Sequence, residues 1–287
     1  MRYFQINGRM KPFVKKATAF LKMPFLTRHL LKVEKRVRFV SASVLLTAYL
    51  LFTTFFSFDF MWVFVPVGLI LAYGLTYLAI IEDIEKVEWG TLFIMPVLFT
   101  AMCYSFYFLF PVRWLTRIPF LFIYSVSIYA LFLTSNIFNV GVEKSLRLYK
   151  AAFSVNYFFQ TFLVFLSTSI IFSLREYFIV NALGAGIISY VLALQLFWTI
   201  KLDLQLSREV QNHALFVAVL MAETAIIVSF LPLRGSVLAL MLAATYYSLS
   251  GLTSAHLDNR LFRTVIREYV VVLVFVWLAA GLTLLGW

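Results

Sequence analysis

One carboxylate lies at the midpoint of a long apolar run. The run covers residues 214–232, which is long enough to cross a bilayer, and Glu223 is at its centre. An acid at that depth costs about 2.5–3.5 kcal/mol, and no other predicted span carries a mid-membrane Lys or Arg to pair with it. We expect the acid to be protonated or to face polar groups, with Asn156, Gln160 and Tyr246 as candidates. The functional hypothesis is a proton- or ion-linked group lining a cavity, and the alternative is an acid that only locks helices together.

Two short connections between apolar runs carry further carboxylates. The first holds Glu82, Asp83 and Glu85, and the second holds Asp203 with Arg208 nearby. Carboxylates gathered in this way suit Mg²⁺, which also accepts phosphate oxygens of a substrate, and Arg can bind the same phosphate. These residues form the candidate metal or diphosphate site, whereas the alternative is a pair of solvated acidic turns. Apart from Mg²⁺ at this candidate metal or diphosphate site, the sequence predicts no cofactor.

The placement of the two acidic connections resembles that of the UbiA-type membrane prenyltransferases. That resemblance implies nine helices, a cytoplasmic N-terminus and aspartate-rich motifs after helices two and six, which bind a polyprenyl diphosphate through Mg²⁺. The chain departs from both motifs. Glu82-Asp83-Ile84-Glu85 lacks the family's Asn-Asp pair, and Ser207 stands where a second aspartate would follow Asp203.

A second resemblance rests on residues 133–152, LTSNIFNVGVEKSLRLYKAA. With polar Asn136 and Asn139 followed by Arg147 and Lys150, this segment resembles a family of uncharacterised polytopic proteins from candidate-phyla bacteria. The resemblance implies a similar number of spans and no particular activity. From the residues themselves, the asparagines can cap a helix end while the basic side chains reach headgroup phosphates.

Composition places the chain among helical membrane proteins. Hydrophobic residues make up 63% and charged residues 13%, against about 45–50% and about 25% in soluble domains. The apolar residues gather in runs near the length that a helix needs to span a bilayer, without the alternation of a barrel. The single cysteine, Cys103, excludes an internal disulfide.

Basic residues are concentrated in the first 38 residues. Eleven of the 24 Lys and Arg residues lie there, and the net charge of the chain is +11. Apolar residues at helical spacing between the lysines predict a helix in the headgroup plane that binds anionic lipid headgroups, and we predict no nucleic-acid partner. The expected domains are this segment, 1–38, and a transmembrane domain, 39–287. No cleavable signal peptide is predicted.

Nine spans are predicted, at 39–57, 60–81, 89–110, 118–137, 151–173, 177–200, 214–232, 235–253 and 269–286. If the N-terminus is cytoplasmic, the inner side carries twenty basic residues and the outer side four. The apolar runs predict an all-α bundle, and we expect it in the cytoplasmic (inner) membrane. The positive-inside rule predicts that its N-terminus is inside and its C-terminus outside.

Small residues recur every four positions in the sixth span, where Ala182 and Gly186 predict close helix packing. They leave the oligomeric state open. In the last connection, His256, Asp258 and Arg260 are spaced two apart, which on a helix would splay them over different faces and does not favour a metal site.

Three functional hypotheses follow. The best supported is a transporter- or carrier-like protein with an intramembrane acid. The alternatives are a Mg²⁺-dependent lipid or prenyl-diphosphate transferase and a structural or assembly subunit. Convergence of the acidic connections would favour the enzyme, whereas a dry, filled interior would favour the structural subunit.

Overall fold

The computed structural model describes residues 34–56, 58–80, 89–107, 109, 114–140, 147–202 and 206–284. Of the basic segment 1–38, it covers only the last five residues. The interfacial helix predicted in that segment therefore lies outside the described residues.

Nine helices in these ranges are long and apolar enough to cross a membrane. The described residues contain no strand, so the predicted all-helical bundle of nine spans is confirmed, and the chain is a multi-pass integral membrane protein. In chain order the helices are α3 (Lys35–Thr53), α4 (Met61–Ile80), α5 (Trp89–Tyr107), α6 (Trp114–Val140), α7 (Arg147–Ser173), α8 (Phe178–Lys201), α9 (Arg208–Ser229), α10 (Gly235–Leu257) and α11 (Arg263–Leu284). A 3-10 helix, Phe58–Phe60, precedes α4.

Five helices begin four or more residues before the apolar run that predicted them. They are α3, α6, α7, α9 and α11. The added turn carries polar or charged residues, which an apolar count leaves out: α7 opens at Arg147 and α11 at Arg263. At the start of α9, the side chain of Ser207 caps the helix by accepting a hydrogen bond from the Val210 amide at 3.3 Å. The headgroup region admits such residues while the backbone stays helical.

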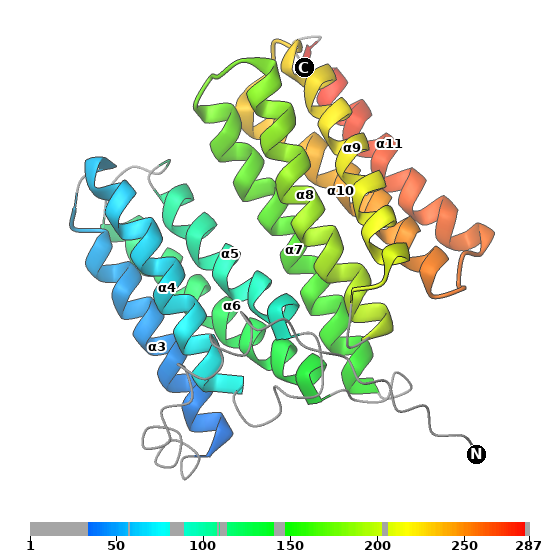
Figure 1. Cartoon of the computed structure of the whole chain (residues 1–287). Coiled ribbons are helices and arrows are strands. Elements are labelled where there is room, and N and C mark those ends of the chain that lie inside the picture. Colours follow the sequence, from blue (N-terminus) through cyan, green and yellow to red (C-terminus); the bar gives the residue numbers. More distant parts are fainter. Residues whose placement is uncertain are drawn as a thin grey trace, which may run out of the picture.

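Successive helices run in opposite directions, so the basic residues can be assigned to the two ends of the bundle (Figure 1). Ten of the described Lys and Arg residues lie at the end where α3, α7, α9 and α11 begin, which we call the basic end: Lys35, Arg36, Arg38, Arg147, Lys150, Lys201, Arg208, Arg260, Arg263 and Arg267. The opposite end holds Arg117, Arg175 and Arg234. The side of the membrane that the basic end faces stays a prediction.

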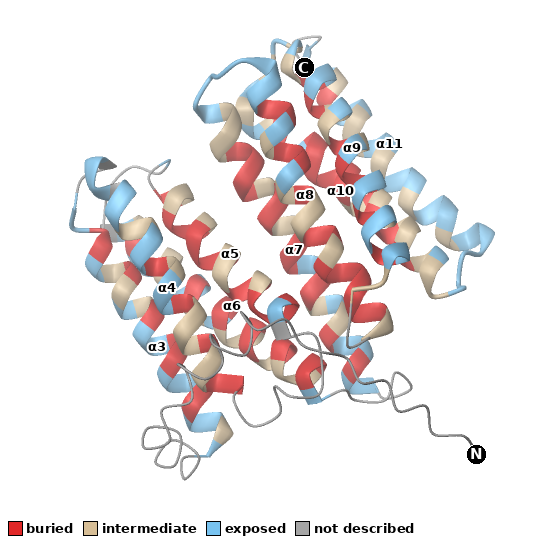
Figure 2. Cartoon of the chain, viewed as in Figure 1, coloured by how far each residue is buried: buried red, intermediate tan, exposed pale blue. Residues whose placement is uncertain are grey.

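The helices form two groups, which are joined mainly by α7 and also by a smaller contact between α5 and α8. α3 to α6 pack as one group and α7 to α11 as the other, and α7 contacts α5 and α6 in addition to α8 and α10 (Figure 1). Buried residues lie on the faces that the helices turn toward one another, and exposed residues lie on the outer faces (Figure 2). α11 is the most peripheral helix, because it packs mainly on α10 and buries only Ala280.

The predicted close packing of the sixth span is confirmed. A Cβ atom at Gly186 of α8 would lie 3.3 Å from the Cβ of Ala222 and 3.4 Å from the carbonyl oxygen of Ala218, both on α9. The two backbones therefore approach as closely as small residues permit. This contact fixes the face that α9 turns toward the bundle.

Candidate functional site

α7 is at the centre of the candidate site because it packs against helices of both groups and carries polar residues on its buried face. Its buried face carries Asn156, Gln160 and Ser167, at spacings of four and seven residues that place them on one side of the helix. The interior of a membrane protein offers little water to polar groups, so buried amides need partners on neighbouring helices.

These partners form a hydrogen-bonded network between α7, α8 and α10. The Asn156 Nδ2 donates to Oε1 of Gln195 at 3.0 Å, and the Gln195 Nε2 donates back to Asn156 Oδ1 at 3.4 Å. The Gln160 Nε2 donates to the Leu192 carbonyl at 3.0 Å and also to Gln195 Oε1. The Tyr246 hydroxyl donates to Gln160 Oε1 at 2.8 Å. We call Asn156, Gln160, Gln195 and Tyr246 the amide network.

All four side chains of the amide network are at most 2% exposed, and each of their polar atoms has a partner. An interhelical hydrogen bond of this kind contributes about 0.6–2 kcal/mol in a membrane. Sequence reasoning found three of the four residues but missed Gln195. Gln195 could have been noticed as an amide inside an otherwise apolar span. Its partners on α7 become apparent only from the packing of α7 on α8.

Glu223 lies outside the amide network. It belongs to the exposed face of α9, together with Phe216, Val219, Ile227 and Phe230. Among the described residues, no hydrogen bond or ion pair joins Glu223 to another side chain. The structure therefore brings Asn156, Gln160 and Tyr246 together but does not bring Glu223 to the three groups predicted to face it. The close packing of α9 on α8 leaves residue 223 on the outer face of the bundle.

The predicted metal or diphosphate site falls largely outside the described residues, since Glu82, Asp83, Glu85 and Asp203 all lie there. Arg208 is described and is exposed at the start of α9. The described ranges contain no group of three or more His, Cys, Asp or Glu residues that could hold a metal ion. Magnesium binding thus stays a prediction.

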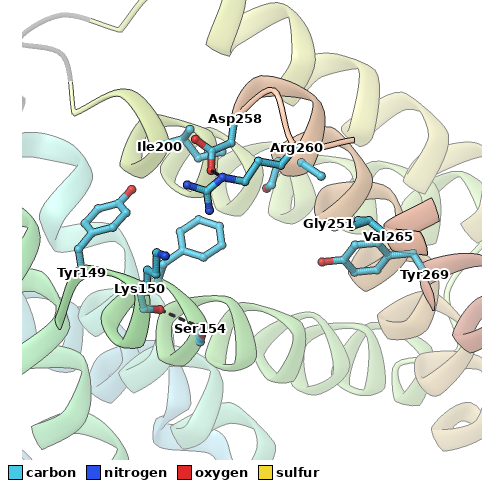
Figure 3. Close-up of a pocket in the computed structure, with 12 residues that line it drawn as sticks. Tyr149, Lys150, Ser154, Ile200, Gly251, Asp258, Arg260, Val265 and Tyr269 are labelled. Carbon is cyan, nitrogen blue, oxygen red and sulfur yellow. Dashed lines mark hydrogen bonds and ion pairs between the residues drawn. The ribbon is translucent and has the colours of Figure 1, made fainter. Parts of the chain in front are cut away.

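A pocket opens at the basic end between α7, α10 and α11 (Figure 3). Its cavity has a volume of about 280 Å³. α7 contributes Lys150 and Phe153, and α10 contributes Ser254. The turn after α10 contributes Asp258 and Arg260, which form an ion pair of 3.2 Å. Sequence reasoning noted Asp258 and Arg260 but gave them no site, because their neighbour Lys150 is distant in the chain.

Tyrosines connect the pocket to the amide network. Tyr269 of α11 lines the pocket, and the centroid of its ring lies 5.2 Å from the ring centroid of Tyr247 on α10. Tyr247 in turn stacks on Tyr157 of α7 at 5.1 Å, and the Tyr157 hydroxyl donates to the Tyr247 carbonyl. Because Tyr157 follows Asn156 and Tyr247 follows Tyr246, the tyrosines lie next to the network. Polar groups thus continue from the pocket into the span.

No protein-family model, curated protein or solved structure matches the chain. The two family resemblances drawn from the sequence therefore stay predictions, and the function has to be argued from the pocket and the amide network.

Proposed function

We propose that the protein is a carrier-like membrane protein that takes up an amphiphilic ligand at the basic end. The observation that carries this proposal is the position of the pocket at the start of a line of polar side chains. The line runs from Lys150 in the pocket through Tyr157 to Gln160 at the centre of α7. A ligand with a polar head and an apolar tail meets matching surfaces along this line, because tyrosine and amide groups can exchange their mutual hydrogen bonds for bonds to the ligand.

The proposed orientation has the basic end in the cytoplasm and the protein in the cytoplasmic membrane. The concentration of ten described basic residues at one end supports this placement under the positive-inside rule. The pocket would then load from the cytoplasmic side, where anionic headgroups attract Lys and Arg.

A structural or assembly subunit is the second candidate, and one observation favours it. The amide network is filled and internally bonded, as expected of side chains that only hold helices together. The two candidates differ in whether the network ever opens to water, which can be measured without knowing the ligand.

Cysteine accessibility tests the proposal. The native Cys103, which is buried, is first replaced by Ala. Single cysteines are then introduced by Ser154→Cys at the pocket, by Ser250→Cys beside the tyrosines and by Ser167→Cys beyond the amide network. A membrane-impermeant methanethiosulfonate is applied from each side of oriented vesicles. A carrier is expected to expose the cysteines at positions 250 and 167 to both sides as it changes conformation.

Ser43→Cys is the matched control, because Ser43 is buried on α3 in the other helix group. It should stay unlabelled from both sides. If the cysteine at position 154 reacts while those at 250 and 167 resist the reagent from either side, the carrier proposal is wrong and the structural subunit is supported.

A further inference from the structure

The geometry points to a ligand with a phosphate group: we propose that the pocket at the basic end binds the phosphate of an anionic amphiphile through Lys150, Arg260 and Ser254. This deepens the proposed function. It rests on that function for the fate of the ligand but not for its binding.

Two cations meet at the pocket from different elements. Figure 3 shows the side chains of Lys150, from the first turns of α7, and Arg260, from the turn after α10, directed into the same cavity. Among the described residues that line the cavity, Asp258 is the only acid. The described lining therefore carries a net positive charge, and an anion that enters the cavity can form charge-assisted hydrogen bonds to the two cations.

The ion pair with Asp258 leaves Arg260 able to bind a ligand. The carboxylate contacts Nε of Arg260 at 3.2 Å, and the side chains are 60% and 40% exposed for Arg260 and Asp258. An arginine has five N–H donors, and Nε carries one of them. The two terminal nitrogens can form the paired hydrogen bonds that phosphate oxygens favour, while Asp258 holds the guanidinium in place.

Ser254 supplies an independent indication of a ligand. It lines the same cavity, it is only 7% exposed, and its hydroxyl has no hydrogen-bond partner among the described residues. A buried hydroxyl without a partner costs about 1–3 kcal/mol, so a ligand oxygen at this position is favoured. Ser254 thus lines the same cavity as Lys150 and Arg260.

The remaining lining defines the rest of the ligand. Phe153 and Tyr269 form apolar walls, and the cavity of about 280 Å³ is at the small end of ligand pockets. A headgroup fits such a volume, whereas acyl chains must lie outside. From the pocket, α11 continues into the membrane with Ile266, Val270 and Val274 exposed at four-residue spacing, a surface that acyl chains can cover.

Binding to the detergent-solubilised full-length protein tests the inference by microscale thermophoresis. The probes are dioctanoyl phosphatidic acid, inorganic phosphate and dioctanoylglycerol, which lacks the phosphate. Phosphatidic acid is expected to bind saturably and dioctanoylglycerol not to bind. Lys150→Gln and Arg260→Gln should each weaken binding by about tenfold or more, because each removes a charge-assisted hydrogen bond.

Arg267→Gln is the matched control, since Arg267 lies at the same basic end on α11 but does not line the pocket. It should change the affinity by less than about twofold, as for an exposed charge. Size-exclusion chromatography checks that each variant folds. If Arg260→Gln fails to fold, Lys150→Gln carries the test, because Lys150 is exposed.

The outcomes separate the sources of the phosphate and the two proposals. Saturable phosphatidic acid binding without phosphate binding identifies a lipid headgroup, whereas equal binding of inorganic phosphate identifies a free anion. The phosphate site is refuted if neither phosphatidic acid nor inorganic phosphate binds. It is also refuted if Arg267→Gln weakens binding as much as Lys150→Gln and Arg260→Gln do. If phosphatidic acid binds but the cysteines are not labelled from both sides, the pocket is a static lipid site and only the carrier function is refuted. If the cysteines are labelled from both sides but no phosphate compound binds, only the phosphate site is refuted.

Discussion

Glu223 and Gln160 are both polar residues inside apolar spans, but the structure gives them different surroundings. Gln160 bonds to residues of α8 and α10, so its polarity is satisfied within the protein. Glu223 is on the exposed face of α9 with no described partner. An isolated acid on an apolar helix face inside a membrane carries a large desolvation cost, so its position on α9 calls for a direct test.

A hydrophobic carbodiimide should therefore modify Glu223. Dicyclohexylcarbodiimide partitions into lipid and reacts with carboxyl groups that it reaches there, so peptide mass spectrometry is expected to find the adduct on α9. A water-soluble carbodiimide should leave Glu223 unmodified. Glu223→Gln removes the adduct and serves as the control, and it should keep the fold because residue 223 packs against no described polar group. Modification by the soluble reagent alone would contradict the lipid-facing position.

At the scale of elements, the contact between α10 and α11 depends on one missing side chain. A Cβ atom at Gly251 would overlap the ring of Tyr269 on α11 and the hydroxyl of Tyr157 on α7. Glycine therefore lets two aromatic side chains meet α10 at one point, directly beside the pocket that Gly251 also lines. The packing of α7, α10 and α11 and the shape of the pocket are thus coupled.

Gly251→Ala should lower stability for this reason. Overpacking of a tight contact costs about 1–3 kcal/mol, which should appear as a lower Tm of the detergent-solubilised protein. Gly74→Ala on α4 is the control, since a Cβ atom there meets nothing within 4 Å. The control should be neutral or slightly stabilising, because alanine favours helix more than glycine does. Equal Tm values for the two variants would refute the predicted overlap.

At the scale of the whole molecule, the nine spans were predictable because an apolar run of sufficient length is a local property of the sequence. The face of α7 that holds Asn156 and Gln160 was predictable for the same reason, since a spacing of four residues fixes a helix face. The helix starts were less predictable, because the first turns of α7 and α11 lie in the headgroup region and carry charge.

What could not be predicted depends on how one helix is rotated against another. Glu223 was expected to line a cavity, but the contact of Gly186 with Ala218 and Ala222 sets the rotation of α9 and leaves the acid outside. The pocket likewise joins Lys150 to Arg260 across more than a hundred residues of chain. No spacing in the sequence encodes that proximity.

Nine crossings by the described helices α3 to α11 would place the start of α3 and the end of α11 on opposite sides of the membrane. With the basic end inside, green fluorescent protein fused before α3 should fluoresce in the cytoplasm, and alkaline phosphatase fused after α11 should be active outside. Exchanging the two reporters is the control and should silence both. A fluorescent fusion after α11 would contradict either the number of spans or their orientation.

The anchoring of α11 restricts how this helix can move. Ser248 donates to the Tyr269 carbonyl at 3.0 Å, and the Trp277 indole donates to Thr245 at 3.2 Å, while the Tyr269 ring covers Gly251. A piston-like slide of one turn would place Val265 or Leu273 over the glycine and break both bonds. These contacts therefore oppose a change in the register of α11 along α10 more than they oppose a tilt of α11 about this point.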